Sequence, residues 1–129
     1  MVLDASSAIE LLLHTDPGAR LAAMLEDEAE VIHAPHLIDL EIAQVLRRYL
    51  LRGTLDEEAA AGALRRWRDF DVERHPHEPL LERVWQLRAN VSAYDAVYVA
   101  LAEALTEVLV TGDRRLARVP GLAVDIEAV

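Results

Sequence analysis

The sequence predicts an α/β fold with one parallel sheet and helices on both of its faces. Short apolar segments alternate along the chain with longer segments whose apolar residues recur at helical spacing. This alternation is typical of parallel sheets, because parallel strands are joined by helices that cover the sheet. The chain has 129 residues, so we expect one domain over residues 1–129.

The first expected strand is the apolar run at residues 1–3, which leads directly into Asp4. A helix follows to about His14, with apolar residues one turn apart. The Asp-Pro-Gly sequence at 16–18 interrupts this pattern, and we expect a second helix over 20–28.

A second strand is expected over 31–33 and a long helix over 36–52. Gly53 directly follows this helix, at the position where a glycine in the left-handed backbone conformation commonly ends a helix. Thr54 or Asp56 then caps the next helix, whose first turn is acidic.

The second half of the chain continues the same alternation. The expected elements there are a strand over 72–74, helices over 79–88 and 92–105, a strand over 108–110, a short helix over 114–118 and a last strand over 122–126.

The composition excludes several classes of function. The net charge of −10 argues against a protein that holds nucleic acid through a basic surface. All thirteen basic residues are Arg, and phosphorylation receivers and haloacid-dehalogenase-type phosphatases normally need a Lys. The absence of Cys excludes disulfides and thiolate chemistry. No apolar run reaches 18 residues, so we expect no membrane span and a cytoplasmic protein.

Four acidic residues stand out by position: Asp4, Glu41, Asp95 and Asp113. Asp4 and Asp113 follow apolar strands, which places both at the sheet edge where open α/β sheets bind ligands. Glu41 emerges from a mostly apolar helix face, and Asp95 lies near the start of a helix. Four like charges in one cleft raise one another's pKa values unless cations bind. Carboxylate oxygens without His or Cys suit Mg²⁺ or Mn²⁺.

Each acid also has a purely structural interpretation. Asp4 or Ser6 suits the cap of the first helix, and Asp113 suits the cap of the short helix that follows it. Asp95 suits the last position of a capping box. Glu41 could form an ion pair with an Arg. Asp39 lies two residues from Glu41 and could contribute to the site instead.

Four stretches occur in order along the chain: V-L-D-A-S-S-A at 2–8, L-I-D-L-E-I-A-Q-V-L-R-R at 37–48, S-A-Y-D-A-V-Y-V-A-L-A at 92–102 and V-L-V-T-G-D-R-R-L at 108–116. With these four stretches in this order, the chain resembles PIN-domain nucleases, and most closely VapC-type toxins of bacterial toxin–antitoxin pairs. The resemblance implies a sheet of about five strands, a homodimer, and a VapB-like antitoxin whose tail covers the cleft.

The resemblance also assigns roles to residues. It implies that an acidic quartet holds the metal, namely Asp4, Glu41, Asp95 and Asp113. Ser6 and Thr111 would orient the carboxylates or a metal-bound water. The implied activity is a Mg²⁺- or Mn²⁺-dependent endoribonuclease that leaves a 5′-phosphate and a 3′-hydroxyl. Single-stranded or looped RNA is favoured as substrate.

A non-catalytic interaction module is the alternative hypothesis. Asp4, Ser6 and Thr111 also resemble a metal-dependent adhesion site of the form Asp-x-Ser-x-Ser, although Ala8 stands at its last Ser position. Metal-dependent ligand binding without nuclease activity would favour this alternative.

The remaining polar and aromatic residues give weaker signals. We expect a turn over 75–77, and scattered structural or exposed histidines at 14, 33 and 36. Packing is the expected role of Trp67, Trp85, Tyr94 and Tyr98. Phosphate contacts or surface ion pairs are expected for Arg47, Arg48, Arg114 and Arg115.

Overall fold

Five parallel strands form one sheet with the order β3-β2-β1-β4-β5 in the computed structural model, which describes residues 1–26 and 30–129. The strands are β1 (Val2–Leu3), β2 (Ile32–Pro35), β3 (Val72–His75), β4 (Leu109–Thr111) and β5 (Ile126–Ala128). The helices are α1 (Ala5–Leu12), α2 (Asp16–Met24), α3 (Ile38–Leu51), α4 (Glu57–Asp69), α5 (Leu81–Gln86) and α6 (Ala93–Leu105). Single 3₁₀ turns lie at η1 (Glu78–Leu80) and η2 (Leu116–Arg118). The predicted parallel α/β fold is confirmed.

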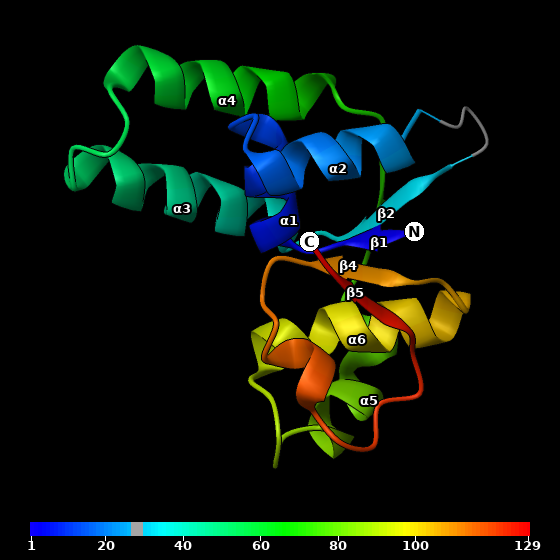
Figure 1. Cartoon of the computed structure of the whole chain (residues 1–129). Coiled ribbons are helices and arrows are strands. Elements are labelled where there is room, and N and C mark those ends of the chain that lie inside the picture. Colours follow the sequence, from blue (N-terminus) through cyan, green and yellow to red (C-terminus); the bar gives the residue numbers. More distant parts are fainter. Residues whose placement is uncertain (27–29) are drawn as a thin grey trace.

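Helices cover both faces of this sheet, as predicted. Figure 1 shows α1 to α4 on one side and α5 and α6 on the other, with α3 and α4 side by side and extending past the sheet. Both residues of the central strand β1 are completely buried, as expected for a strand covered on two faces. None of the helices in the described residues is long and apolar enough to cross a bilayer.

The second helix begins earlier than the sequence predicted. It begins at Asp16, and the hydroxyl of Thr15 caps it by accepting a hydrogen bond from the backbone N–H of Gly18 at 3.1 Å. Pro17 lies in the first turn, where its fixed φ and missing N–H are tolerated. The predicted break between two helices is present, but the Asp-Pro-Gly sequence forms the first turn of the second helix instead of preceding it. Residues 27–28 of the expected helix lie outside the described residues.

The last strand also lies elsewhere than predicted, at β5 instead of over 122–126. The segment before it is a loop whose backbone bonds a helix side chain instead of a strand: Glu103 Oε1 accepts a hydrogen bond from the backbone N–H of Ala123 at 3.0 Å. Strand pairing begins only where Ile126 lies beside Leu109. The expected helix over 114–118 is the single 3₁₀ turn η2. Gly53 adopts a φ of 73°, as predicted for the residue that closes the long helix.

Close packing of α1 against α2 requires a glycine. A Cβ at Gly18 would lie 2.0 Å from the backbone oxygen of Glu10, so the backbone must move to accept one. We predict that Gly18→Ala lowers the free energy of unfolding by about 1–3 kcal/mol. Gly62→Ala in α4 is the matched control, because its Cβ would lie 3.5 Å from the nearest atom. This control is expected to gain about 0.5–1 kcal/mol. Urea unfolding measures both, and equal effects would contradict the packing argument.

Candidate active site

A cleft of about 460 Å³ lies where β1 and β4 end, beside the first turns of α3 and α6. Its lining includes all four acids that the sequence singled out, namely Asp4, Glu41, Asp95 and Asp113. The topology brings them together, because β1 and β4 are adjacent parallel strands whose carboxyl ends meet at one edge. The predicted clustering of these side chains in one cleft is therefore observed.

Asp4 is held in a fixed orientation at the base of this cleft. Its Oδ1 accepts hydrogen bonds from the hydroxyl of Ser6 at 2.7 Å and from the backbone N–H of Ser7 at 2.8 Å. Its Oδ2 accepts a hydrogen bond from the hydroxyl of Thr111. The bond from Ser7 also makes Asp4 the cap of α1, so its structural interpretation is correct as well.

Ser6 and Thr111 also join the ends of β1 and β4. The Ser6 hydroxyl accepts a hydrogen bond from the backbone N–H of Gly112 at 2.8 Å. The Thr111 hydroxyl accepts one from the backbone N–H of Asp113 at 2.9 Å. A Cβ at Gly112 would lie 3.1 Å from the Ser6 oxygen, so the absence of a side chain at this position lets the backbone come close to Ser6. The two hydroxyls therefore fix Asp4 and the loop that carries Asp113 relative to one another.

Glu41 is bonded to a tyrosine and has no Arg partner among the described residues. The buried hydroxyl of Tyr98 donates a hydrogen bond to Glu41 Oε2 at 2.5 Å. Burial raises the pKa of the Glu41 carboxyl, the bond from Tyr98 lowers it in part, and the charges of Asp4 and Asp95 raise it further. Glu41 therefore faces the like charges of Asp4 and Asp95, and it forms no ion pair of its own with any basic side chain in residues 1–26 and 30–129.

Sequence reasoning assigned Tyr98 to packing alone and missed this contact with Glu41. Burial and the hydrogen bond to Glu41 both raise the pKa of the Tyr98 hydroxyl, which keeps it protonated as a donor. Its position three residues after Asp95 was an available signal, because residues at this spacing lie on one face of a helix.

Asp113 and Asp95 lie nearer the solvent than Asp4. The Asp113 carboxylate accepts hydrogen bonds from the Arg115 guanidinium, the shortest at 2.8 Å, and from the backbone N–H of Arg115. These bonds lower the pKa of the Asp113 carboxyl. The Arg115 side chain is 91% exposed, so this ion pair is weak and easily exchanged. Asp95 is exposed, and its backbone N–H donates to the Ser92 hydroxyl at 3.1 Å, which is the first half of the expected capping box.

Asp39 lies outside the cleft, although it is only two residues from Glu41. Its carboxylate accepts hydrogen bonds from Trp67 Nε1 at 2.7 Å and from the Arg74 guanidinium at 2.8 and 3.0 Å. Burial raises the pKa of the Asp39 carboxyl, but the bonds from Arg74 and Trp67 outweigh it and lower the pKa overall. The charge of Asp39 is thus satisfied at the contact between α3, α4 and β3.

The donor set of the cleft fits a hard divalent cation. Four carboxylates face it, and the electrostatic strain on Glu41 is of the kind that a bound cation relieves. In residues 1–26 and 30–129, no three of these acids have ligand oxygens all within 4.8 Å of one another. The cleft is therefore an open arrangement of carboxylates and not a closed ligand cage.

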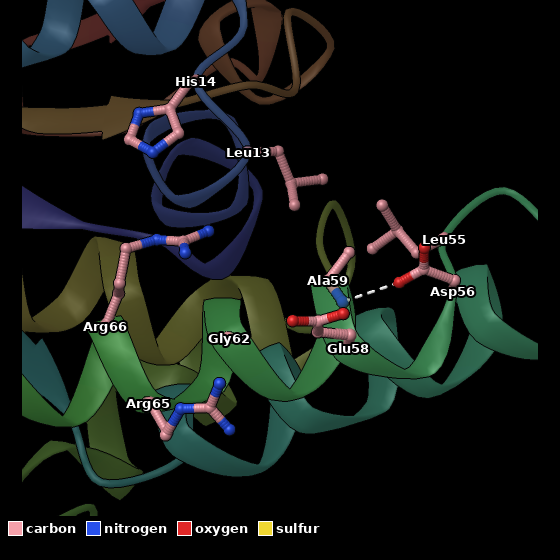
Figure 2. A pocket seen from close by; sticks show the side chains of 9 residues that line it. All are labelled: Leu13, His14, Leu55, Asp56, Glu58, Ala59, Gly62, Arg65 and Arg66. Atoms are coloured by element: carbon pink, nitrogen blue, oxygen red, sulfur yellow. Dashed lines mark hydrogen bonds between the residues drawn. The ribbon is translucent and has the colours of Figure 1, made fainter.

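A second hollow, of about 520 Å³, lies between the end of α1 and the outer face of α4 (Figure 2). Two of its polar side chains form hydrogen bonds that stabilise the fold. Asp56 caps α4 by accepting a hydrogen bond from the backbone N–H of Ala59 at 2.8 Å, and Arg66 donates to the backbone oxygen of Leu12 at 2.8 Å. The acidic cleft therefore remains the stronger candidate for a functional site.

Comparisons with known proteins identify the family of this chain. The chain is 49% identical to ribonuclease VapC9 of Mycobacterium tuberculosis over 116 residues. The matched region makes up 90% of this chain and 87% of that protein. The crystal structure of PAE2754 from Pyrobaculum aerophilum matches with a TM-score of 0.69 and 26% identity, over 97% of this chain and 81% of that one. VapBC2 from Rickettsia felis, bound to a promoter DNA fragment, contains a chain that matches with a TM-score of 0.72 and 14% identity, over 99% of this chain and 97% of that one. The family model for the PIN domain matches residues 1–122, and the chain belongs to this family.

Proposed function

We propose that the protein is a metal-dependent endoribonuclease, the VapC-type toxin of a toxin–antitoxin pair. The observation that carries this proposal is the meeting of Asp4, Glu41, Asp95 and Asp113 in one cleft. Family membership and the ribonuclease names of its relatives support RNA as the substrate. RNA cleavage by the purified protein tests the proposal, with an Asp4→Asn variant as the control.

The four acids are the residues that would hold Mg²⁺ or Mn²⁺. When bound, such an ion would activate water and stabilise the charge that develops on the phosphodiester. The chain contributes the orientation of the ligands, because Asp4 is fixed by Ser6 and Thr111. The Tyr98 hydroxyl fixes Glu41 in the same way. We infer a 5′-phosphate and a 3′-hydroxyl as the products.

The rim of the cleft suits single-stranded RNA. Tyr94 lines the cleft and is exposed, contrary to its expected packing role, and can stack on an unpaired base. Arg48 lies in the same lining, and the exposed Arg115 lies beside Asp113, so both are placed to contact phosphates. These side chains provide local attraction for RNA despite the net charge of −10.

A VapB-like antitoxin with a basic tail is the partner that we propose for this cleft. The excess of carboxylates attracts Arg or Lys side chains, and a chain with the same fold occurs in the VapBC2 structure. A saturating amount of the antitoxin is expected to suppress RNA cleavage, and unchanged cleavage would contradict the partner assignment.

We also propose that the protein forms a homodimer, that residues 1–129 make up one domain, and that the protein is located in the cytoplasm.

The structure gives little support to an adhesion-type site. Such a site needs a further hydroxyl ligand where Ala8 stands, and Ala8 is completely buried in α1. Ser6 and Thr111 both donate to Asp4, which suits a supporting role for the two hydroxyls.

We predict that Tyr98→Phe lowers the rate of RNA cleavage by about 10–100-fold, because loss of an outer partner frees a metal ligand to rotate. The aromatic ring keeps its packing, so the free energy of unfolding should fall by only about 1 kcal/mol. Single-turnover cleavage over a range of Mn²⁺ concentrations measures the effect. A cleavage rate equal to that of the wild type would show that the bond to Glu41 serves only the fold.

A further inference from the structure

Three side chains with metal-binding atoms lie together outside the acidic cleft. His33 of β2 and Glu73 and His75 of β3 have ligand atoms that are all within 4.8 Å of one another. The distance from His33 Nδ1 to His75 Nε2 is 3.1 Å. Glu73 Oε2 lies 3.6 Å from His33 Nδ1, and Glu73 Oε1 lies 3.8 Å from His75 Nε2.

The sheet holds these side chains in place. His33 lies directly beside Glu73 in the register of β2 and β3, and alternate residues of a strand point to the same face. Glu73 and His75 therefore share a face, while Arg74 between them points to the other face and bonds Asp39. The three ligands come from two hydrogen-bonded strands, so their spacing is set by backbone geometry.

The spacing suits one tetrahedral ion. Metal–ligand bonds of about 2.0–2.1 Å in a tetrahedron place neighbouring ligand atoms about 3.4 Å apart. The two imidazole nitrogens are 3.1 Å apart, slightly closer than that value. Each lies slightly farther than that value from one oxygen of the Glu73 carboxylate, at 3.6 Å for Oε2 and 3.8 Å for Oε1, so small side-chain rotations would complete the geometry. The two imidazoles are largely buried, while the Glu73 side chain is 61% exposed. Water can therefore reach a fourth position on the solvent side.

We propose that His33, Glu73 and His75 form a second metal site, which binds a transition-metal ion of the Zn²⁺ type. Two imidazoles and one carboxylate are ligands typical of Zn²⁺, whereas the oxygen-only cleft suits Mg²⁺ or Mn²⁺. The two sites therefore select different ions. This proposal goes beyond the nuclease function and does not depend on it.

The same residues have a simpler arrangement, in which the two imidazoles share a hydrogen bond and Glu73 lies beside them. The sequence led us to expect a turn at 75–77 and a structural or exposed His33. In the structure His75 is the last residue of β3, and its backbone oxygen accepts a hydrogen bond from the N–H of His36 at 2.9 Å. An ion at this site would tie the edge strand β3 to β2 just before α3, so its binding should raise Tm.

The test is a calorimetric titration of untagged, chelator-treated protein with Zn²⁺ in excess Mg²⁺, which competes with Zn²⁺ for sites made of carboxylates alone. We expect one equivalent of Zn²⁺ to bind and to raise Tm. Glu73→Gln and His75→Gln should each weaken binding by more than about tenfold, since even outer-shell losses cost 10–100-fold. His14→Asn is the control, because it removes a histidine that is not part of the cluster, and it should bind Zn²⁺ as the wild type does.

Two further measurements keep the result independent of how well the variants fold. Co²⁺ bound to the wild-type protein should give the visible absorption of a four- or five-coordinate ion, and Zn²⁺ should abolish it. Asp4→Asn should retain the Zn²⁺ equivalent, so failure of the nuclease proposal leaves this proposal intact. The proposal is overturned if Zn²⁺ does not bind, if Glu73→Gln and His75→Gln bind it like the wild type, or if only Asp4→Asn loses it.

Discussion

Replacing Asp4 with Asn is expected to lower metal-dependent RNA cleavage by at least about 1,000-fold while the fold is retained. Bound metal supplies several kcal/mol of transition-state stabilisation, and each 1.36 kcal/mol corresponds to a factor of ten in rate. Asn is as good a helix cap as Asp, and its oxygen can still accept the hydrogen bond from Ser7. Cleavage rates under single-turnover conditions and a circular dichroism spectrum measure the two effects.

Asp39→Asn is the matched control, because it makes the same chemical change on α3 outside the cleft. It weakens the bonds to Arg74 and is expected to cost about 1 kcal/mol of stability, since the pair is partly exposed. Its cleavage rate should equal that of the wild type. Full activity of Asp4→Asn, or an equal loss in both variants, would contradict the assignment of the cleft.

The largest expected effect on stability is that of Trp67→Ala, at about 3–5 kcal/mol. Trp67 is 1% exposed, its Nε1 donates to Asp39, and the Arg74 guanidinium lies 5.6 Å from the centre of its ring. The substitution therefore leaves a cavity and also removes a donor where α3, α4 and β3 meet. Urea unfolding at one temperature gives the change in the free energy of unfolding.

Trp85→Ala is the control for this prediction. Trp85 is 67% exposed and contacts the exposed Arg88 of its own segment, so its loss should change stability by about 0.5 kcal/mol or less. Comparable losses in both variants would contradict the role of Trp67 as the central contact of these elements.

The acidic cleft could be predicted because its placement follows from local patterns. An apolar run that ends in Asp4 or Asp113 indicates a buried strand and a carboxylate at its end, and parallel topology brings both to one edge. Glu41 was identifiable as an acid on a mostly apolar helix face. Each of these signals lies within a few residues of the side chain concerned.

The features that sequence analysis missed depend on contacts between distant segments. The bond between Tyr98 and Glu41 joins two helices, and the cluster of His33 and His75 depends on the register of β2 against β3. The loop before β5 is bonded to Glu103 of α6, which is also distant in the sequence. The spacing of Tyr98 and Asp95 could place Tyr98 on the cleft side of its helix, but no local pattern identifies the partner in any of these contacts.

The most direct test of the proposed function is cleavage of a single-stranded RNA oligonucleotide by the purified wild-type protein. The assay compares Mg²⁺, Mn²⁺ and a chelator, with single-stranded DNA of the same sequence and the Asp4→Asn protein alongside, and mass spectrometry identifies the ends. We predict RNA cleavage with either ion, no cleavage in chelator, recovery when the ion is restored, and 5′-phosphate ends. Undiminished cleavage in chelator, or by Asp4→Asn prepared in the same way, would contradict a metal site formed by the four acids.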